Sequence, residues 1–180
     1  PGKMAAVFGL SEKKIDELCE SVCDAGVVSP ANYNCPGQVV LSGDRAGIDR
    51  ILEEAPARGA KRCIELPVGG AFHSALMEPA VEPLSSVLET IAFSPARVPV
   101  IPNVTAEPTQ DPNHLKRLLL EQVVSPVKWT DSIKRLISEG IDRAIEVGPG
   151  SVLQGLMRRI DRKLSVSGAG TLKEIEEVVG

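Results

Sequence analysis

Residues 31–43 of this 180-residue chain read ANYNCPGQVVLSG, and this stretch decides the fold. Cys35-Pro36-Gly37 is typical of a turn, and the segments on both sides of it are interpreted as strands. The stretch therefore predicts two strands, residues 31–34 and 38–42, joined by a turn.

The flanking sequence places a strand and a helix on each side of this pair. Residues 4–9 form a short apolar run, and a helix capped by Ser11 is expected to follow it to about Ala25. After the pair, a helix beginning at Asp44 and ending near Gly59 leads to a strand over residues 62–66. The order β-α-β-β-α-β is found in ferredoxin-like folds, so residues 1–67 are expected to form one compact subdomain.

The remainder of the chain, residues 68–180, alternates helices with short apolar strands, which indicates α/β layering. The expected helices cover residues 74–91, 112–124, 129–139 and 151–160, with a last helix after Thr171; the expected strands cover residues 98–103, 144–147 and 164–166.

Composition narrows the possible classes of protein. The 20 Lys and Arg residues stand against 24 Asp and Glu, so the net charge of −4 offers no general electrostatic footprint for nucleic acid. No apolar segment approaches the length of a membrane span, and no secretory signal is visible. The four cysteines are Cys19, Cys23, Cys35 and Cys63. Two lie on one predicted helix and the others in predicted strands or turns, so reduced thiols are favoured over disulfides. Their spacing does not match a zinc site.

The two histidines are the first candidates for chemistry. His73 follows a predicted strand in a loop with two glycines, where it could act as a general base or merely hydrogen-bond a neighbour at a helix start. Ser74 is better placed to cap the next helix than to be a nucleophile. His114 fits a surface position in an early helical turn, and no Gly-x-Ser-x-Gly nucleophile elbow occurs in the sequence.

Other polar features each have a structural alternative. Asn32 and Asn34 point to the same side of a regular strand, where they could line a polar cleft or prepare the turn. Cys35 could be a nucleophile, but nothing near it in the sequence marks an activated thiol, so a packed thiol is favoured. Gly148-Pro149-Gly150 could cradle a phosphate at a helix start, although a tight strand-to-helix turn explains it better.

Six motifs follow one another along the chain. They are Pro1-Gly2-x-Met4-Ala5-Ala6-Val7, Ala31-Asn32-Tyr33-Asn34-x-Pro36-Gly37-Gln38, Pro67-Val68-x-Gly70-x-Phe72-His73-Ser74, Asn103-Val104-Thr105-Ala106, Gln122-x-x-Ser125-Pro126-Val127-x-Trp129 and Glu146-Val147-Gly148-Pro149-Gly150. In this order they resemble the malonyl-CoA:acyl-carrier-protein transacylases of fatty-acid synthesis, across nearly the whole chain.

The resemblance implies a covalent acyl transfer that needs no bound cofactor and no metal. A serine takes the malonyl group from coenzyme A and passes it to the phosphopantetheine thiol of acyl carrier protein. His73 matches the family's base, and Gln122 matches the position whose backbone carbonyl orients that imidazole. Asn32 and Asn34 match polar positions lining the site, and Phe72 matches the aromatic residue that accompanies malonyl selection in related enzymes.

The resemblance also implies what lies outside this chain. The family's nucleophile elbow, oxyanion loop and substrate arginine belong to an N-terminal half without a counterpart in this sequence. Residues 1–67 match the ferredoxin-like insertion, and residues 68–180 match the C-terminal portion of an α/β-hydrolase-like acyltransferase domain. The missing half would be a partner, and the chain alone would be inactive. The expected location is the bacterial cytoplasm, or an organelle matrix or stroma.

Two other interpretations stay open. The chain could be an acyltransferase domain of a polyketide or multifunctional fatty-acid synthase. It could instead be a non-catalytic module that docks an acidic carrier protein through basic residues, namely Lys116, Arg117, Lys128, Arg158 and Arg159.

Overall fold

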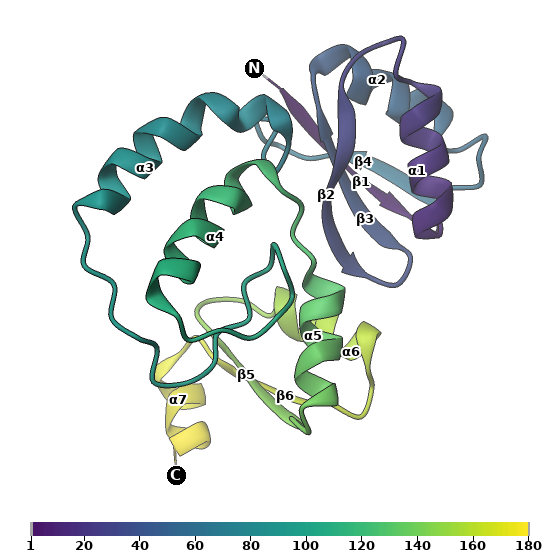
Figure 1. Ribbon diagram of the computed structural model, residues 1–180. Helices are drawn as coiled ribbons and strands as arrows, with labels where there is room; N and C mark the ends of the chain where they lie inside the picture. Colours follow the sequence, from purple (N-terminus) through teal and green to yellow (C-terminus); the bar gives the residue numbers. More distant parts are fainter. Residues whose placement is uncertain (1, 180) are drawn as a thin grey trace.

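The computed structural model describes residues 2–179, so Pro1 of the first motif lies outside the described residues. The chain begins with a β-α-β-β-α-β unit, which confirms the predicted order of elements (Figure 1). Its elements are β1 (Lys3–Phe8), α1 (Glu12–Ser21), β2 (Val28–Cys35), β3 (Gln38–Gly43), α2 (Arg45–Glu54) and β4 (Arg62–Glu65). The strands lie in the order β2-β3-β1-β4, and every neighbouring pair is antiparallel.

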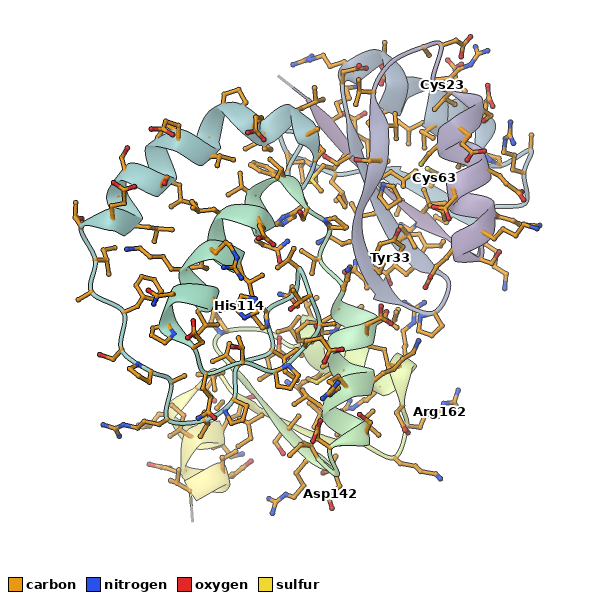
Figure 2. All side chains as sticks on the ribbon, in the orientation of Figure 1. Cys23, Tyr33, Cys63, His114, Asp142 and Arg162 are labelled. Atoms are coloured by element: carbon orange, nitrogen blue, oxygen red, sulfur yellow. The ribbon has the colours of Figure 1, made fainter. Side chains whose placement is uncertain are left out.

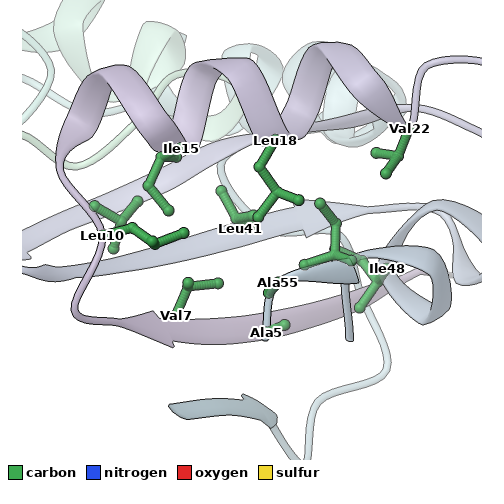
Figure 3. Packing of buried hydrophobic residues seen from close by; sticks show 11 residues of the cluster. Ala5, Val7, Leu10, Ile15, Leu18, Val22, Leu41, Ile48 and Ala55 are labelled. Atoms are coloured by element: carbon green, nitrogen blue, oxygen red, sulfur yellow. The ribbon is translucent and has the colours of Figure 1, made fainter. Parts of the chain in front are cut away.

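Alternation along the two central strands gives this sheet two buried faces. Val7 and Leu41 point toward α1 and α2, where they pack against buried aliphatic side chains of both helices (Figure 3). Met4, Ala6 and Val40 form a second cluster on the opposite face. Because side chains of a strand alternate between faces, neither central strand has a solvent-facing side.

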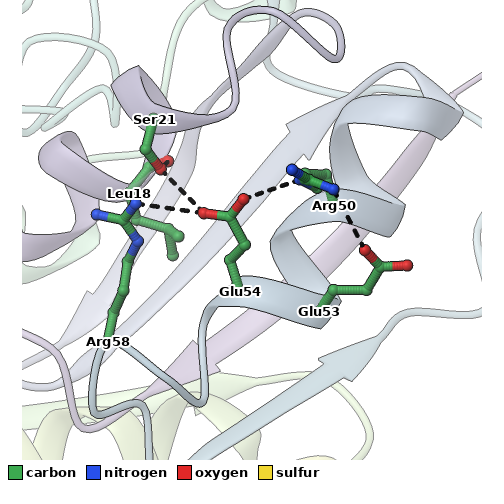
Figure 4. Close-up of polar contacts among 6 residues, drawn as sticks. All are labelled: Leu18, Ser21, Arg50, Glu53, Glu54 and Arg58. Carbon is green, nitrogen blue, oxygen red and sulfur yellow. Dashed lines mark hydrogen bonds and ion pairs between the residues drawn. The ribbon is translucent and has the colours of Figure 1, made fainter.

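Polar contacts fix the two helices that cover the sheet. Figure 4 shows the carboxylate of Glu54 accepting hydrogen bonds from Arg50 Nε at 2.8 Å, Arg58 Nη2 at 3.2 Å and Ser21 Oγ at 3.4 Å. Burial acts to raise the pKa of the Glu54 carboxyl, but the hydrogen bonds from Arg58 and Arg50 outweigh it and hold this pKa below its ordinary value. Since Ser21 ends α1, the cluster joins α1 to α2.

The rest of the chain is a second α/β region. Its elements are the 3₁₀ helix η1 (Ala75–Ala80), α3 (Val81–Glu89), α4 (Pro112–Val124), α5 (Trp129–Ser138), β5 (Arg143–Val147), α6 (Val152–Ile160), β6 (Ser165–Ala169) and α7 (Leu172–Val179). β5 and β6 pair in parallel, and α6 is the crossover between them. Ile133, Met157, Leu164 and Val166 form the core of this region.

Two predicted elements of this region are wrong. Residues 98–103 do not form a strand; they contribute one isolated bridge, between Val100 and Thr109, because prolines at 99 and 102 have no N–H for a ladder. The single helix expected over residues 74–91 is divided into η1 and α3, with Pro79 inside η1. Proline cannot donate the hydrogen bond that a continuous α-helix needs there.

Strand β2 connects the two regions. Its edge exchanges backbone hydrogen bonds with Val127: Tyr33 N donates to Val127 O at 2.9 Å, and Val127 N donates to Ala31 O at 2.8 Å. The hydroxyl of Thr130, at the start of α5, donates to the carbonyl of Tyr33 at 3.0 Å. Segment 126–128 is therefore fixed by the small sheet. The division of the chain into domains at residue 67 stays a prediction.

Candidate active site

His73 lies in a closed turn with an uncommon backbone conformation. Its φ of +59° is in the left-handed region, which costs a non-glycine residue about 1–2 kcal/mol. The next residue, Ser74, occupies the N-cap position of η1 but makes no capping hydrogen bond, so the predicted capping role is wrong. Its hydroxyl instead turns back and donates to the carbonyl of Ala71 at 2.6 Å.

The imidazole of His73 meets the C-terminal end of α4. Nδ1 lies 3.0 Å from the carbonyl oxygen of Gln122. Within a continuous helix this carbonyl would accept from the N–H four residues later, but that residue is Pro126, which has none. Pro126 also favours the extended conformation of Ser125, which ends the helix. One proline therefore stops α4 and leaves the Gln122 carbonyl free for the histidine.

This contact fixes the neutral tautomer of the ring. A carbonyl oxygen can only accept a hydrogen bond, so Nδ1 must carry the hydrogen and donate it to Gln122. Nε2 then holds a lone pair, as a proton acceptor must. His73 is half-buried. The arrangement suits a general base that is oriented by a backbone carbonyl.

The loop around His73 is packed closely against the start of β1. A Cβ added to Gly2 would lie 2.6 Å from the Cβ of Ala71, which shows how near the two backbones are. Gly2 N also donates to Gly69 O at 3.3 Å. Phe72, by contrast, is 44% exposed, and its ring lies over Gly70. Phe72 thus exposes part of its aromatic ring, one residue before His73 in the chain.

The two asparagines are on β2 but are not equivalent. Asn32 is paired with Val40 of β3 and bridges to Val127, five residues after Gln122. Register shifts interrupt β2, and the one between Tyr33 and Cys35 leaves Asn34 unpaired with β3. Regular alternation therefore does not hold in this strand. Among residues 2–179, no hydrogen bond joins either asparagine side chain to His73.

The other candidate groups have structural roles. The four cysteines are free; Cys23 lies in the turn after α1 and Cys63 lies in β4 (Figure 2). Burial raises the pKa of Cys35, while Arg159 acts in the opposite direction, so Cys35 is a packed thiol and not an activated one. His114 is in the first turn of α4, where its N–H is capped by Asp111.

The turn before α6 already holds a carboxylate. Gly148 and Gly150 have φ values of +126° and +95°, which makes this segment a tight strand-to-helix turn. Glu146 accepts from the N–H groups of Leu153 at 3.0 Å and Gln154 at 3.1 Å. Burial acts to raise the pKa of Glu146, but these hydrogen bonds outweigh it and lower this pKa. Its side chain takes the place a phosphate would occupy.

Two classes of site gain no support from the described part of the chain. Within residues 2–179, no three His, Cys, Asp or Glu side chains gather as metal ligands would. In the same residues, no helix combines the length and apolar character needed to cross a bilayer.

Comparison with known families gives one match over nearly the whole chain. The acyl transferase domain family matches residues 1–174. The chain belongs to this family.

Acyl transferases similar to this chain are considerably longer. The malonyl CoA-acyl carrier protein transacylase of Staphylococcus aureus (strain COL) is 42% identical over 176 residues, which are 97% of this chain and 57% of that protein. The enzyme of the same name from Bacillus subtilis (strain 168) is 42% identical over 176 residues, 97% of this chain and 56% of that one. The chain thus spans little more than half the length of these relatives.

Solved structures give the same picture. The acyl-carrier-protein S-malonyltransferase of Bartonella henselae superposes with a TM-score of 0.95 at 40% identity, covering 99% of this chain and 57% of that one. A malonyl-transacylase in complex with its type II PKS acyl-carrier protein gives a TM-score of 0.92 at 37% identity, covering 97% of this chain and 57% of that one.

Sequence analysis missed residues that support the site in this acyl transferase domain. Pro126 had a readable signal, because a proline four residues after Gln122 must leave that carbonyl without a helical partner. Val127 and Thr130 had none, since their bonds are to a strand about 95 residues earlier in the sequence. The bond from Ser74 to Ala71 was also not predicted, because a serine hydroxyl at this position can either cap the next helix or donate to a nearby backbone carbonyl.

Proposed function

We propose that this chain supplies the base of a malonyltransferase that carries malonyl from coenzyme A to the phosphopantetheine thiol of acyl carrier protein. The observation that carries the proposal is the 3.0 Å contact between His73 Nδ1 and the Gln122 carbonyl, in a chain that belongs to the acyl transferase domain family. The names of the relatives from Staphylococcus aureus and Bacillus subtilis support malonyl-CoA as donor and acyl carrier protein as acceptor.

In the proposed first step, Nε2 of His73 removes the proton of a serine hydroxyl as the oxygen attacks the malonyl thioester. The tetrahedral intermediate collapses to a malonyl ester, and the imidazolium returns its proton to the departing coenzyme A sulfur. In the second step Nε2 takes the proton of the carrier-protein thiol, which attacks the ester. The serine oxygen leaves and regains the proton. Gln122 keeps its hydrogen bond to Nδ1 throughout.

The serine of this mechanism is proposed to come from outside the present chain. The sequence contains no Gly-x-Ser-x-Gly elbow, and the chain covers only 57% of the Staphylococcus aureus relative. An uncovered apolar surface supports the same conclusion, because Ile145 and Val147 on β5 are 50% and 83% exposed. A mainly apolar cavity of about 330 Å³ also borders Gln122. We expect no malonyl transfer by the chain alone.

Further assignments follow from the same proposal. Phe72 restricts the space beside the thioester and favours malonyl over branched acyl groups, which one such contact does by about 1–3 kcal/mol. Asn32 and Asn34 supply polar groups to the same cleft. The proposed reaction needs no cofactor beyond the coenzyme A thioester itself, and its proposed location is a bacterial cytoplasm or an organelle matrix or stroma.

The test uses a hybrid protein. The N-terminal part of the Staphylococcus aureus relative that lies outside the match is fused upstream of this chain, and transfer of labelled malonyl from coenzyme A to holo acyl carrier protein is measured. The hybrid is expected to transfer malonyl, and His73→Ala in the hybrid is expected to lower kcat at least about 100-fold, the contribution of a general base.

His114→Ala is the matched control, because it removes the other histidine of the chain and is expected to leave kcat unchanged. A hybrid in which His73→Ala is as active as the parent would disprove the assigned role. Malonyl transfer by the 180-residue chain without any fusion would disprove the external serine.

The alternative of a non-catalytic docking module has less support. Most of the basic side chains invoked for it already contact groups in this chain: Lys116 contacts the Ile91 carbonyl and the Phe93 ring, Arg117 pairs with Glu121, Arg158 donates to the Val166 carbonyl, and Arg159 donates to Gln38. Binding of holo acyl carrier protein to a hybrid that lacks all transfer activity would favour this alternative.

A further inference from the structure

The geometry points to a second residue that controls the base: we propose that Ser74 is a positioning residue, which holds His73 in the orientation that places Nδ1 on the Gln122 carbonyl. Its importance for catalysis rests on the proposed function, but its effect on the histidine does not. Ser74 stands at the N-cap of η1, but its hydroxyl makes no capping bond and donates to the Ala71 carbonyl instead.

The hydroxyl closes the turn that carries the histidine. Ser74 Oγ donates to Ala71 O at 2.6 Å, so the bond spans the two residues between them, Phe72 and His73. Ser74 is 1% exposed, and water therefore cannot replace this donor. Ala71 is buried as well and lies against Gly2 of the neighbouring region. The acceptor end of the bond is thus fixed, and the bond transmits that fixed position to residues 72–74.

The closed turn accounts for the strained backbone of His73. A φ of +59° is unfavourable for a residue with a Cβ, and the ring contact with Gln122 alone does not require it, because a flexible loop could bring Nδ1 to the same carbonyl by other backbone angles. With the turn closed by Ser74, the direction of the Cα–Cβ bond of His73 is set. The imidazole then has two supports: the hydroxyl of Ser74 through the backbone, and Gln122 through Nδ1.

The test measures the tautomer of His73 directly and requires no substrate. All variants carry His114→Gln, so the single remaining histidine can be followed by ¹⁵N NMR at alkaline pH. The parent is expected to show protonated Nδ1 and unprotonated Nε2. Ser74→Ala is expected to lower the ratio of this tautomer to the other about tenfold, the effect of losing about one hydrogen bond. Ser74→Thr, which keeps the hydroxyl, is expected to restore the ratio.

Ser138→Ala is the matched control, because the Ser138 hydroxyl donates to the carbonyl of Arg135 with the same three-residue spacing on an exposed helix end. It should leave the His73 ratio unchanged. A Ser74→Ala protein that melts at a lower temperature with the parent's tautomer ratio would overturn the proposal, because Ser74 would then contribute to packing alone.

If Ser74→Ala does not fold, Ser74→Cys decides, because it keeps the side-chain size with a much weaker donor. A shifted ratio supports the positioning role and an unchanged ratio overturns it. Failure of the proposed function would appear separately, as an active His73→Ala hybrid, and would leave this measurement valid.

Discussion

The two regions of the molecule use the same kinds of element but cover their sheets differently. In the sheet β2-β3-β1-β4, both faces of the central strands are buried, by α1 and α2 on one side and by a second apolar cluster on the other. The parallel pair β5-β6 has α5 and α6 over one face, while Ile145 and Val147 remain largely exposed. Figure 1 shows the contrast between a complete four-stranded sheet and a pair of strands.

The difference in how far the two sheets are covered indicates a different structural role for each region. Burial of apolar surface on both faces stabilises a sheet, so we expect the small sheet to be the rigid support of the two. An exposed apolar strand is typical of a surface that another segment covers. The candidate site lies where the rigid support meets the uncovered region, because β2 holds segment 126–128 and thereby the end of α4. The following predictions test this contrast, from the largest expected effect to the smallest.

The largest effect is expected from truncating the core of the complete sheet. Ile48→Ala removes a side chain that is 0% exposed and is expected to lower the free energy of unfolding by about 3–4 kcal/mol, through lost burial and the cavity left behind. Ile145→Ala makes the same chemical change on the exposed strand and should cost less than about 0.5 kcal/mol. Urea unfolding followed by circular dichroism measures both. Equal losses for the two variants would contradict the contrast between the regions.

A smaller effect is expected at the cap of α2. The carboxylate of Asp44 accepts from Gly47 N at 2.8 Å and Val27 N at 2.7 Å, and these bonds hold the pKa of Asp44 below its ordinary value. Asp44→Ala is expected to cost about 1–2 kcal/mol at neutral pH. Asp142→Ala, an exposed loop aspartate before β5, is the matched control in the other region and should have little effect.

The sign of the pH dependence follows from the direction of that shift. Because the folded state lowers the pKa, Asp44 contributes its full stability above the unfolded-state value of about 3.9 and loses it as pH falls through the lower folded-state pKa. The difference in unfolding free energy between the parent and Asp44→Ala should therefore be constant above about pH 5 and shrink below about pH 4. A difference that stays constant into strong acid would show that the carboxylate charge is not involved.

Local patterns were sufficient to predict the first region. The apolar run of β1, the turn at Pro36-Gly37 and the helix start at Asp44 are all signals within a few residues of the elements they specify, and the β-α-β-β-α-β order is confirmed. Prediction failed where proline opposed an apolar pattern. Residues 98–103 have strand-like side chains but lack donors at Pro99 and Pro102, and Pro79 divides the helix expected to start at Ser74.

The candidate site was only partly accessible from sequence. His73 was an ambiguous histidine on local evidence, and only the resemblance to a family suggested its partner at Gln122. The two are 49 residues apart, and no periodicity links them. The left-handed backbone of His73 was equally hidden, because the sequence around it does not reveal that Ser74 bonds Ala71 instead of capping η1. Long-range contacts and competing bonds of one side chain are what the sequence leaves undetermined.

An effect of about 1 kcal/mol is expected at the junction of the two regions. Thr130→Val keeps the shape of a side chain that is 4% exposed but removes the hydroxyl that donates to the Tyr33 carbonyl. Thr130→Ser should retain most of the bond. The unfolding free energy is measured by fluorescence of Trp129, the only tryptophan. Thr90→Val, which removes an exposed hydroxyl bonded to Val87 O, should change it by less than about 0.5 kcal/mol. Equal losses of unfolding free energy in the two valine variants would show that the hydrogen bond at the junction contributes no more than an exposed one.

The smallest effect on the chain itself is expected at the exposed strand. Val147→Lys puts a charge on a residue that is 83% exposed, so the isolated chain should lose less than about 0.5 kcal/mol. In the hybrid with the N-terminal part of the Staphylococcus aureus relative, the same substitution should cost several-fold more, because the charge is then buried in an apolar contact. Val147→Ile should be tolerated in both proteins. If Val147→Lys were equally mild in the hybrid, β5 would not face the added segment, and the uncovered surface would need another explanation.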